Sequence, residues 1–167
     1  MPIKREAFIE SVASSLLKNE TYCYKVQASD DEQVISLLEE QGIITPYNDD
    51  PELWVFSHDV YEEIIVNHIF DEKYDDGYEL TQITDIFANS LRSRKMYRMW
   101  LETKLKEPDS NLLSTLTSAL VNAEFPQFWK DETIIALMNS EDDESFLIME
   151  SLFSANNYEL FTRSVFL

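Results

Sequence analysis

Residues 37–65, LLEEQGIITPYNDDPELWVFSHDVYEEII, decide the fold that the sequence predicts. Apolar residues up to Leu38 are spaced as on one face of a helix, and Gly42 stands where a helix commonly ends. Two short β-type runs then flank PYNDDP, a turn-rich segment that indicates a hairpin. A helical pattern starts directly at Ser57-His58-Asp59. The stretch therefore predicts a helix, a two-stranded hairpin and a second helix in immediate succession.

The residues before this stretch extend the same small domain. Apolar side chains at helical spacing predict a helix over residues 3–18 with one inward face, formed by Ile3, Ala7, Phe8, Val12, Leu16 and Leu17. Residues 20–28 alternate, which predicts a short strand or an extended link. Ser29 is followed three residues later by Glu32, as in a capping box, so we expect Ser29 to cap a helix that runs to Gln41.

The helix after the hairpin begins at residue 59. Four apolar side chains fall on one side of it, and we expect that side to face the core: Val60, Ile64, Ile65 and Ile69. His68 lies on the same stripe, so we interpret it as a part-buried helix residue rather than a ligand. Residues 1–76 then form a helical domain with a two-stranded wing.

From residue 78 onward the patterns are helical and they recur. The triplet Leu80, Ile83 and Phe87 returns after 33 residues as Leu113, Leu116 and Leu120, and again as Phe146, Met149 and Phe153; Leu101 and Leu105 likewise return as Ile134 and Met138. Such a period with two helices per unit is typical of an α-solenoid. Chance agreement between amphipathic helices is the alternative. The predicted fold class is thus mostly α, with helical repeats over residues 77–167.

The end of the chain lacks the polar cap that a terminal solenoid repeat needs, because it reads Ser164-Val165-Phe166-Leu167. We expect Leu160, Val165 and Phe166 to be exposed. The same observation suggests that the chain is a piece of a longer protein with further repeats.

Composition excludes several classes of function. The formal net charge is −19, which repels nucleic acids and anionic membranes. Gly42 and Gly77 are the only glycines, so neither a phosphate loop nor a dinucleotide fingerprint can be present. His58 and His68 are ten residues apart and Cys23 is the only cysteine, so the spacing predicts no metal site. We therefore expect no enzyme activity from the chain alone.

The single cysteine excludes an internal disulfide and fits a reducing compartment. The N-terminal residues have no continuous apolar core of the kind found in signal peptides, and the apolar runs are too short to span a bilayer. We expect a cytoplasmic protein. The helix over residues 30–41 carries five carboxylates and no Lys or Arg, so we do not expect it to bind DNA.

Residues 37–65 resemble the winged-helix domain of STAND ATPases, the signalling NTPases that include the NACHT and NB-ARC defence proteins. The resemblance depends on Leu37-Leu38, Gly42-Ile43-Ile44 and Phe56-Ser57-His58-Asp59, followed by Glu62 and Glu63. It covers about residues 1–75. The repeat array that follows resembles the sensor arm of such proteins. The ATPase module that precedes the winged helix in this family does not occur in this sequence.

The resemblance implies a role for His58. In this family the corresponding histidine contacts the β-phosphate of ADP and holds the resting state. It further implies that ATP or ADP with magnesium binds the parent protein, that the parent's own ATPase module and a ligand protein on the repeats are the partners, and that antiviral defence is the setting. The alternative is that His58 is an ordinary first-turn residue, with Ser57 or Asp59 as the helix cap.

Two other functions remain open. One is a stand-alone acidic interaction module, such as a phage-encoded inhibitor that mimics DNA through its negative charge. The other is a scaffold solenoid that has no connection with nucleotides. Both are non-catalytic, as is the first hypothesis for this chain alone.

Overall fold

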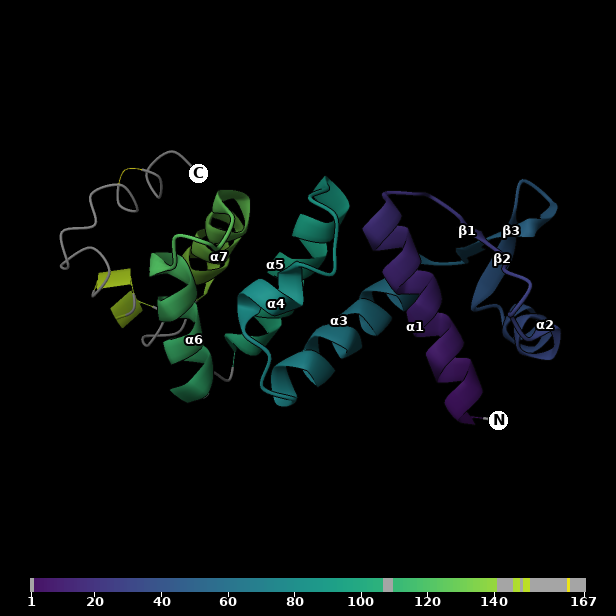
Figure 1. The fold of residues 1–167 in the computed structure, drawn as a ribbon, viewed down its shortest axis with the longest axis horizontal. Helices are drawn as coiled ribbons and strands as arrows, with labels where there is room; N and C mark the ends of the chain where they lie inside the picture. The colour runs from purple at the N-terminus through teal and green to yellow at the C-terminus, as the bar shows by residue number, and fades with distance from the viewer. Residues whose placement is uncertain (1, 107–109, 141–145, 148, 151–161, 163–167) are drawn as a thin grey trace. The chain divides into compact units, whose positions relative to one another are not determined.

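The computed structural model describes residues 2–106, 110–140, 146–147, 149–150 and 162. Over these residues the chain is mostly helical, with helices α1 to α7 and one antiparallel sheet of three strands (Figure 1). Contacts along the chain define two compact units. The first comprises residues 1–72 and 86–90, and the second comprises residues 73–85 and 91–167.

The first unit is built from α1 (Pro2–Asn19), β1 (Tyr24–Lys25), α2 (Glu32–Glu40), β2 (Ile44–Tyr47), β3 (Asp50–Phe56) and most of α3 (Asp59–Asp75). The helix predicted over residues 3–18 is confirmed. Its inner face joins one apolar cluster with the sheet and α2, formed by Phe8, Val12, Leu16, Tyr24, Val34, Ile35, Leu38, Ile44 and Trp54. Ala7, which was expected inside, is exposed.

The hairpin between β2 and β3 is confirmed, and its loop is shorter than the turn-rich segment suggested. Asn48 and Asp49 adopt left-handed conformations, with φ of 55° and 60°. Two consecutive left-handed residues match the twist of antiparallel strands, and Asn and Asp tolerate this region of backbone space. The flanking prolines lie within the strands, where Pro46 pairs with Trp54.

The sheet has three strands rather than the two expected for the wing. Strand β1 pairs antiparallel with β3, with Tyr24 opposite Trp54, so the order is β1-β3-β2. From the sequence, β1 could be either a strand or an extended link, because two residues are too few to show an alternating pattern. Its pairing with the edge of β3 that does not face β2 makes it a strand.

The start of α2 differs from the prediction. Asp31 is the cap, and its side chain accepts a hydrogen bond from the Gln33 N–H at 3.1 Å. Ser29 instead lies in the preceding turn, which the Asp30 carboxylate closes by accepting from the Gln27 N–H at 2.7 Å. The expected cap on Ser29 is therefore wrong, because Asp31 is an equally favourable cap residue and stands two residues nearer to the helix.

The end of α2 follows the prediction. Gly42 has φ of 67°, its N–H donates to the Glu39 carbonyl at 2.8 Å, and the Ile43 N–H donates to the Leu38 carbonyl at 3.0 Å. This pair of bonds satisfies carbonyl groups that the helix leaves open. It also turns the chain directly into β2.

The predicted inner face of α3 is largely wrong. Val60 and Ile64 are 51% and 60% exposed, whereas Ile69 is buried as expected. The buried stripe consists of Glu62, Val66, Ile69 and Phe70. Because this stripe includes the carboxylate of Glu62, the spacing of apolar residues alone did not predict it. Phe70 packs against Phe87 at a ring distance of 5.0 Å, within the same unit.

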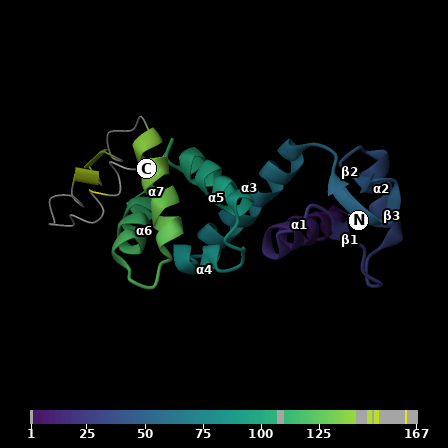
Figure 2. The same ribbon diagram turned by 90° about the horizontal axis from the view of Figure 1, so that it is seen from above.

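The second unit contains α4 (Leu80–Thr84), α5 (Leu91–Lys104), α6 (Ser110–Val121) and α7 (Gln127–Asn139). Helix α5 packs against α7, and α6 contacts both α4 and α7 (Figures 1 and 2). Aromatic side chains fill the space between α5 and α7: the Tyr97 ring lies 5.1 Å from Trp129 and 6.0 Å from Trp100. All three rings are buried.

Most of the residues that recur at the 33-residue spacing are buried. Those in the second unit are Leu80, Ile83, Leu101, Leu105, Leu116, Leu120, Ile134 and Met149, and Phe87 is buried in the first unit. Leu113 is only half-buried, while Met138 and Phe146 are 53% and 69% exposed, so these three positions do not follow the expectation. Phe153, Leu160, Val165 and Phe166 lie outside the described residues.

None of the helices in the described ranges combines the length and the apolar content that crossing a bilayer requires.

Candidate functional site

The junction between β3 and α3 holds the residue that the sequence singled out, His58. Ser57 fixes this junction. Its N–H donates to the Ile43 carbonyl at 3.0 Å, and its hydroxyl donates to the carbonyls of Gly42 and Ile43. The residue that follows the hairpin is thereby tied to the end of α2 and the start of β2.

His58 itself is exposed and immediately precedes α3. Its carbonyl accepts the Tyr61 N–H at 3.0 Å, as expected at the first turn of a helix. The imidazole lies 5.8 Å from the Tyr61 ring at an angle of 55°. Because the ring is exposed on a junction that Ser57 holds in place, it can meet the surface of a partner.

The surroundings of His58 are mixed with respect to an anion. The N–H groups of a helix start and an imidazole N–H are donors suited to a phosphate oxygen. Asp59 and Glu62 stand in the same first turn and repel a negative charge. The residues therefore fit a phosphate only where a partner or a bound cation supplies positive charge. Among the described residues, those around His58 do not by themselves provide a complete anion site.

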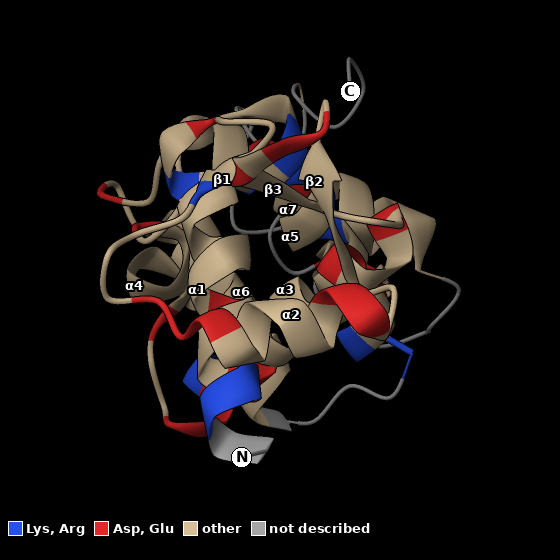
Figure 3. Ribbon diagram, turned by 90° about the vertical axis from the view of Figure 1, so that its right-hand side faces the viewer, with Lys and Arg blue, Asp and Glu red and all other residues tan. Residues whose placement is uncertain are grey.

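The charge of the chain as a whole is also unfavourable for an anion. Acidic residues number 32 against 13 Lys and Arg, and red segments recur over the ribbon in Figure 3. Five of the cations are on α5. Arg98 pairs with Glu132 at 3.2 Å, Arg94 lies over the Phe128 ring, and Lys104 lies over the Tyr74 ring. These three cations thus contact side chains of their own unit.

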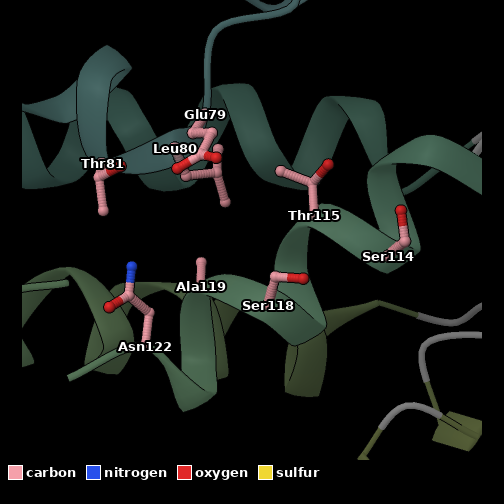
Figure 4. Close-up of a pocket in the computed structure, with 8 residues that line it drawn as sticks. All are labelled: Glu79, Leu80, Thr81, Ser114, Thr115, Ser118, Ala119 and Asn122. Carbon is pink, nitrogen blue, oxygen red and sulfur yellow. The ribbon is translucent and has the colours of Figure 1, made fainter. Parts of the chain in front are cut away.

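A groove of about 370 Å³ lies in the second unit, between α4 and α6 (Figure 4). It is lined by Glu79, Leu80, Thr81, Ser114, Thr115, Ser118, Ala119 and Asn122. Four of these residues carry hydroxyl groups: Thr81, Ser114, Thr115 and Ser118. The Ser114 hydroxyl donates to the Asn111 carbonyl at 2.9 Å. The lining contains neither a histidine nor a cysteine nor a lysine, so it offers no activated nucleophile.

A second cluster gathers around His68, on the solvent side of α1 and α3. The His68 Nε2 atom lies 3.9 Å from Glu6 Oε1, 3.8 Å from Glu10 Oε1 and 3.8 Å from Glu72 Oε1. Partial burial, followed by the charges of Glu72 and Glu6, raises the pKa of the Glu10 carboxyl, while His68 lowers it. The raised pKa of Glu10 thus reflects its partial burial first and the neighbouring carboxylates second.

Sequence reasoning missed this cluster. His68 was interpreted as a part-buried helix residue, but its side chain is 47% exposed. The partners on α1 are about sixty positions away in the chain, so no motif spacing connects them. The signal that could have found them is a pair of i,i+4 spacings: Glu6 with Glu10, and His68 with Glu72.

The chain matches none of the protein-family models scanned, and a search of curated proteins likewise finds no match.

Proposed function

We propose that the chain is a non-catalytic regulatory module of a STAND-type signalling ATPase. In this proposal the first unit is a winged-helix domain that lies against the parent's ATPase module. The helices of the second unit begin a repeat array that binds a ligand protein. The observation that carries the proposal is the exposed imidazole of His58 at the junction of the hairpin with α3.

The arrangement of the first unit supports this assignment. Helix, short strand, helix and hairpin follow one another, and β1 extends the hairpin to a three-stranded sheet. Gly42 ends α2 at the position that the family motif gives to glycine. Ser57 donates to the carbonyls of that same glycine and of Ile43, so the two ends of the motif, Gly-Ile and Ser-His, contact each other.

The arrangement of the second unit supports the repeat array. Helices α4 and α5 form one pair, and α6 and α7 form the next. Corresponding members of the pairs contact each other, α4 with α6 and α5 with α7. Stacked repeats bury their apolar faces in this way, each against its neighbour.

In the parent protein, ATP or ADP with magnesium would be held by the ATPase module, which would supply the positive charge that the first turn of α3 lacks. His58 would donate a hydrogen bond to a phosphate oxygen of ADP and so favour the resting state. The first-turn N–H groups of α3 add favourable partial charge at the same place. Loss of this contact would free the module for activation.

The test is ADP retention by the full product of the reading frame that encodes this chain. We expect His58→Ala to weaken ADP binding by about tenfold to a hundredfold, the loss expected for one charge-assisted hydrogen bond. His68→Ala is the matched control, because it removes the chain's other histidine, which lies on α3 away from the junction. Equal ADP affinity in the two variants would refute the role of His58.

A second candidate function is an acidic protein-binding module that acts alone, and the net charge of −19 favours it. A partner with a basic surface, rather than a nucleotide-bound module, would then be the target. The two functions differ in their dependence on salt. Binding through the acidic surface weakens steeply as salt screens the charges, whereas the contact of His58 with a phosphate is local.

A further inference from the structure

We propose that Glu6, Glu10, His68 and Glu72 form a binding site for a divalent transition-metal ion of the zinc class, which joins α1 to α3. One ligand atom from each of Glu6, Glu10 and His68 lies within 4.8 Å of the others. The Oε1 atom of Glu72 is 3.8 Å from the same imidazole nitrogen. The site belongs wholly to the first unit and is separate from His58.

The backbone positions the ligands in two pairs. Glu6 and Glu10 are four residues apart on α1, and His68 and Glu72 are four residues apart on α3. Residues at this spacing lie on the same face of a helix, one turn apart. These two pairs bring ligand atoms of Glu6, Glu10 and His68 within 4.8 Å of one another, so one ion can be held by these three side chains. Glu72, which is close to His68 alone, can supply a fourth ligand after its side chain rotates.

The distances fit an ion of this size. Zinc binds imidazole nitrogen and carboxylate oxygen at about 2.0–2.2 Å, which places neighbouring ligand atoms of a tetrahedral site about 3.4 Å apart. The three distances from His68 Nε2 to carboxylate oxygens are 3.8–3.9 Å. They exceed the tetrahedral separation by about half an ångström or less, a gap that side-chain rotation can close.

One protonated histidine cannot balance the negative charge of this cluster. Three carboxylates face one histidine, so the cluster keeps a net negative charge whether His68 is neutral or protonated. A divalent cation offsets this repulsion while it takes all four side chains as ligands. The residues around it are open to solvent, with Glu10 the least exposed at 28%, so water can complete the coordination.

The donor set decides the class of metal. One imidazole nitrogen with carboxylate oxygens suits zinc and its neighbours in the first transition row. Magnesium and calcium prefer sites made only of oxygen ligands, and soft ions such as Cu(I) prefer the thiolates that this cluster lacks. We therefore infer that Zn²⁺ binds in preference to Mg²⁺.

The test is calorimetric titration of the full chain, freed of metal with a chelator, with ZnCl₂ and separately with CoCl₂. We expect one strong site per chain with a dissociation constant in the micromolar range or tighter, unaffected by millimolar Mg²⁺. His68→Gln and Glu10→Gln should each weaken that site at least tenfold. His58→Gln, just before the same helix, and Glu63→Gln, on that helix outside the cluster, are the matched controls and should leave the site unchanged.

Two further readouts separate the site from general attraction of cations to an acidic surface. Bound Co²⁺ should give visible absorption bands that His68→Gln abolishes, and saturating Zn²⁺ should raise the melting temperature of the chain but not that of His68→Gln. Equal zinc binding by the chain and His68→Gln would overturn the proposal. The same holds if zinc raises the melting temperature of both proteins alike, or if the chain binds no zinc at all.

Discussion

The hydrogen bond between Tyr97 and Thr133 should be a main link between α5 and α7. Both residues are fully buried, and their hydroxyl oxygens are 2.8 Å apart. The Thr133 hydroxyl also donates to the Trp129 carbonyl at 2.8 Å, which uses its only hydrogen. Tyr97 is therefore the donor and Thr133 the acceptor. Burial raises the pKa of Tyr97, in keeping with a phenol that stays protonated.

This direction predicts unequal costs for the two single substitutions. Tyr97→Phe removes the donor and leaves Thr133 bonded to Trp129, so it should lower the free energy of unfolding by about 1 kcal/mol. Thr133→Val keeps the shape but removes the acceptor from a buried hydroxyl, and should cost about 1–3 kcal/mol. The double variant should cost less than the sum, with a coupling of about 1 kcal/mol.

Urea unfolding of the four proteins, followed by circular dichroism, gives the cycle. Thr133→Ser is the control, because it keeps the hydroxyl and loses only a methyl group. Costs that add within about 0.3 kcal/mol would refute the reasoning, since contacting residues that share a hydrogen bond should couple. So would a Thr133→Val variant as stable as the Tyr97→Phe variant.

Three further predictions concern nucleotides, charge and backbone. The chain alone should neither hydrolyse ATP nor bind ATP or ADP with magnesium, and calorimetry that gave a micromolar dissociation constant would contradict this. Glu10→Gln should stabilise the metal-free chain at neutral pH by about 0.5 kcal/mol, because like charges on neighbouring helix turns repel by this order. The pKa of Glu10 is raised by burial and by Glu72, so the folded state binds the proton more tightly than the unfolded state does. The stability that this proton contributes is fully present below the pKa of Glu10 in the unfolded state, and it is lost as pH rises through the pKa in the folded state. The stability gained by Glu10→Gln should therefore vanish in acid. Urea unfolding at neutral and at acidic pH, with a chelator present, tests this. Gly42→Ala should cost about 1–2 kcal/mol, because φ of 67° is unfavourable for a side chain although no atom lies within 4 Å of the added carbon; Gly42→Asn should cost less, and equal melting temperatures for the two variants would count against the argument.

Local signals predicted the parts of the fold that depend on backbone chemistry. Gly42 ends α2 in the left-handed region, and Asn48 and Asp49 close the hairpin, because few residues accept such conformations. These features act over a few residues. They can therefore be recognised without knowledge of what packs against them.

Features that depend on distant partners were predicted less well. The buried face of α3 contains Glu62 and therefore differs from the predicted face of Val60 and Ile64, which are exposed. Pairing with β3 converted residues Tyr24 and Lys25 into a third strand. Burial on a helix and pairing at a sheet edge are decided by tertiary contacts, which outweigh the weak preferences of short segments.

The candidate sites follow the same division. His58 could be placed at the start of a helix because the strand-to-helix change is visible in the sequence. Its exposure could not be read there. The cluster around His68 needed the structure, because α1 and α3 are joined only by folding.

The most direct test of the central claim is the DNA sequence upstream of the codon for residue 1. A regulatory module of a STAND-type ATPase should follow its ATPase module in one open reading frame. We expect the frame to continue upstream into a segment that encodes a GxxxxGK[ST] phosphate loop. An in-frame stop codon followed by a ribosome-binding site directly before Met1 would contradict the account.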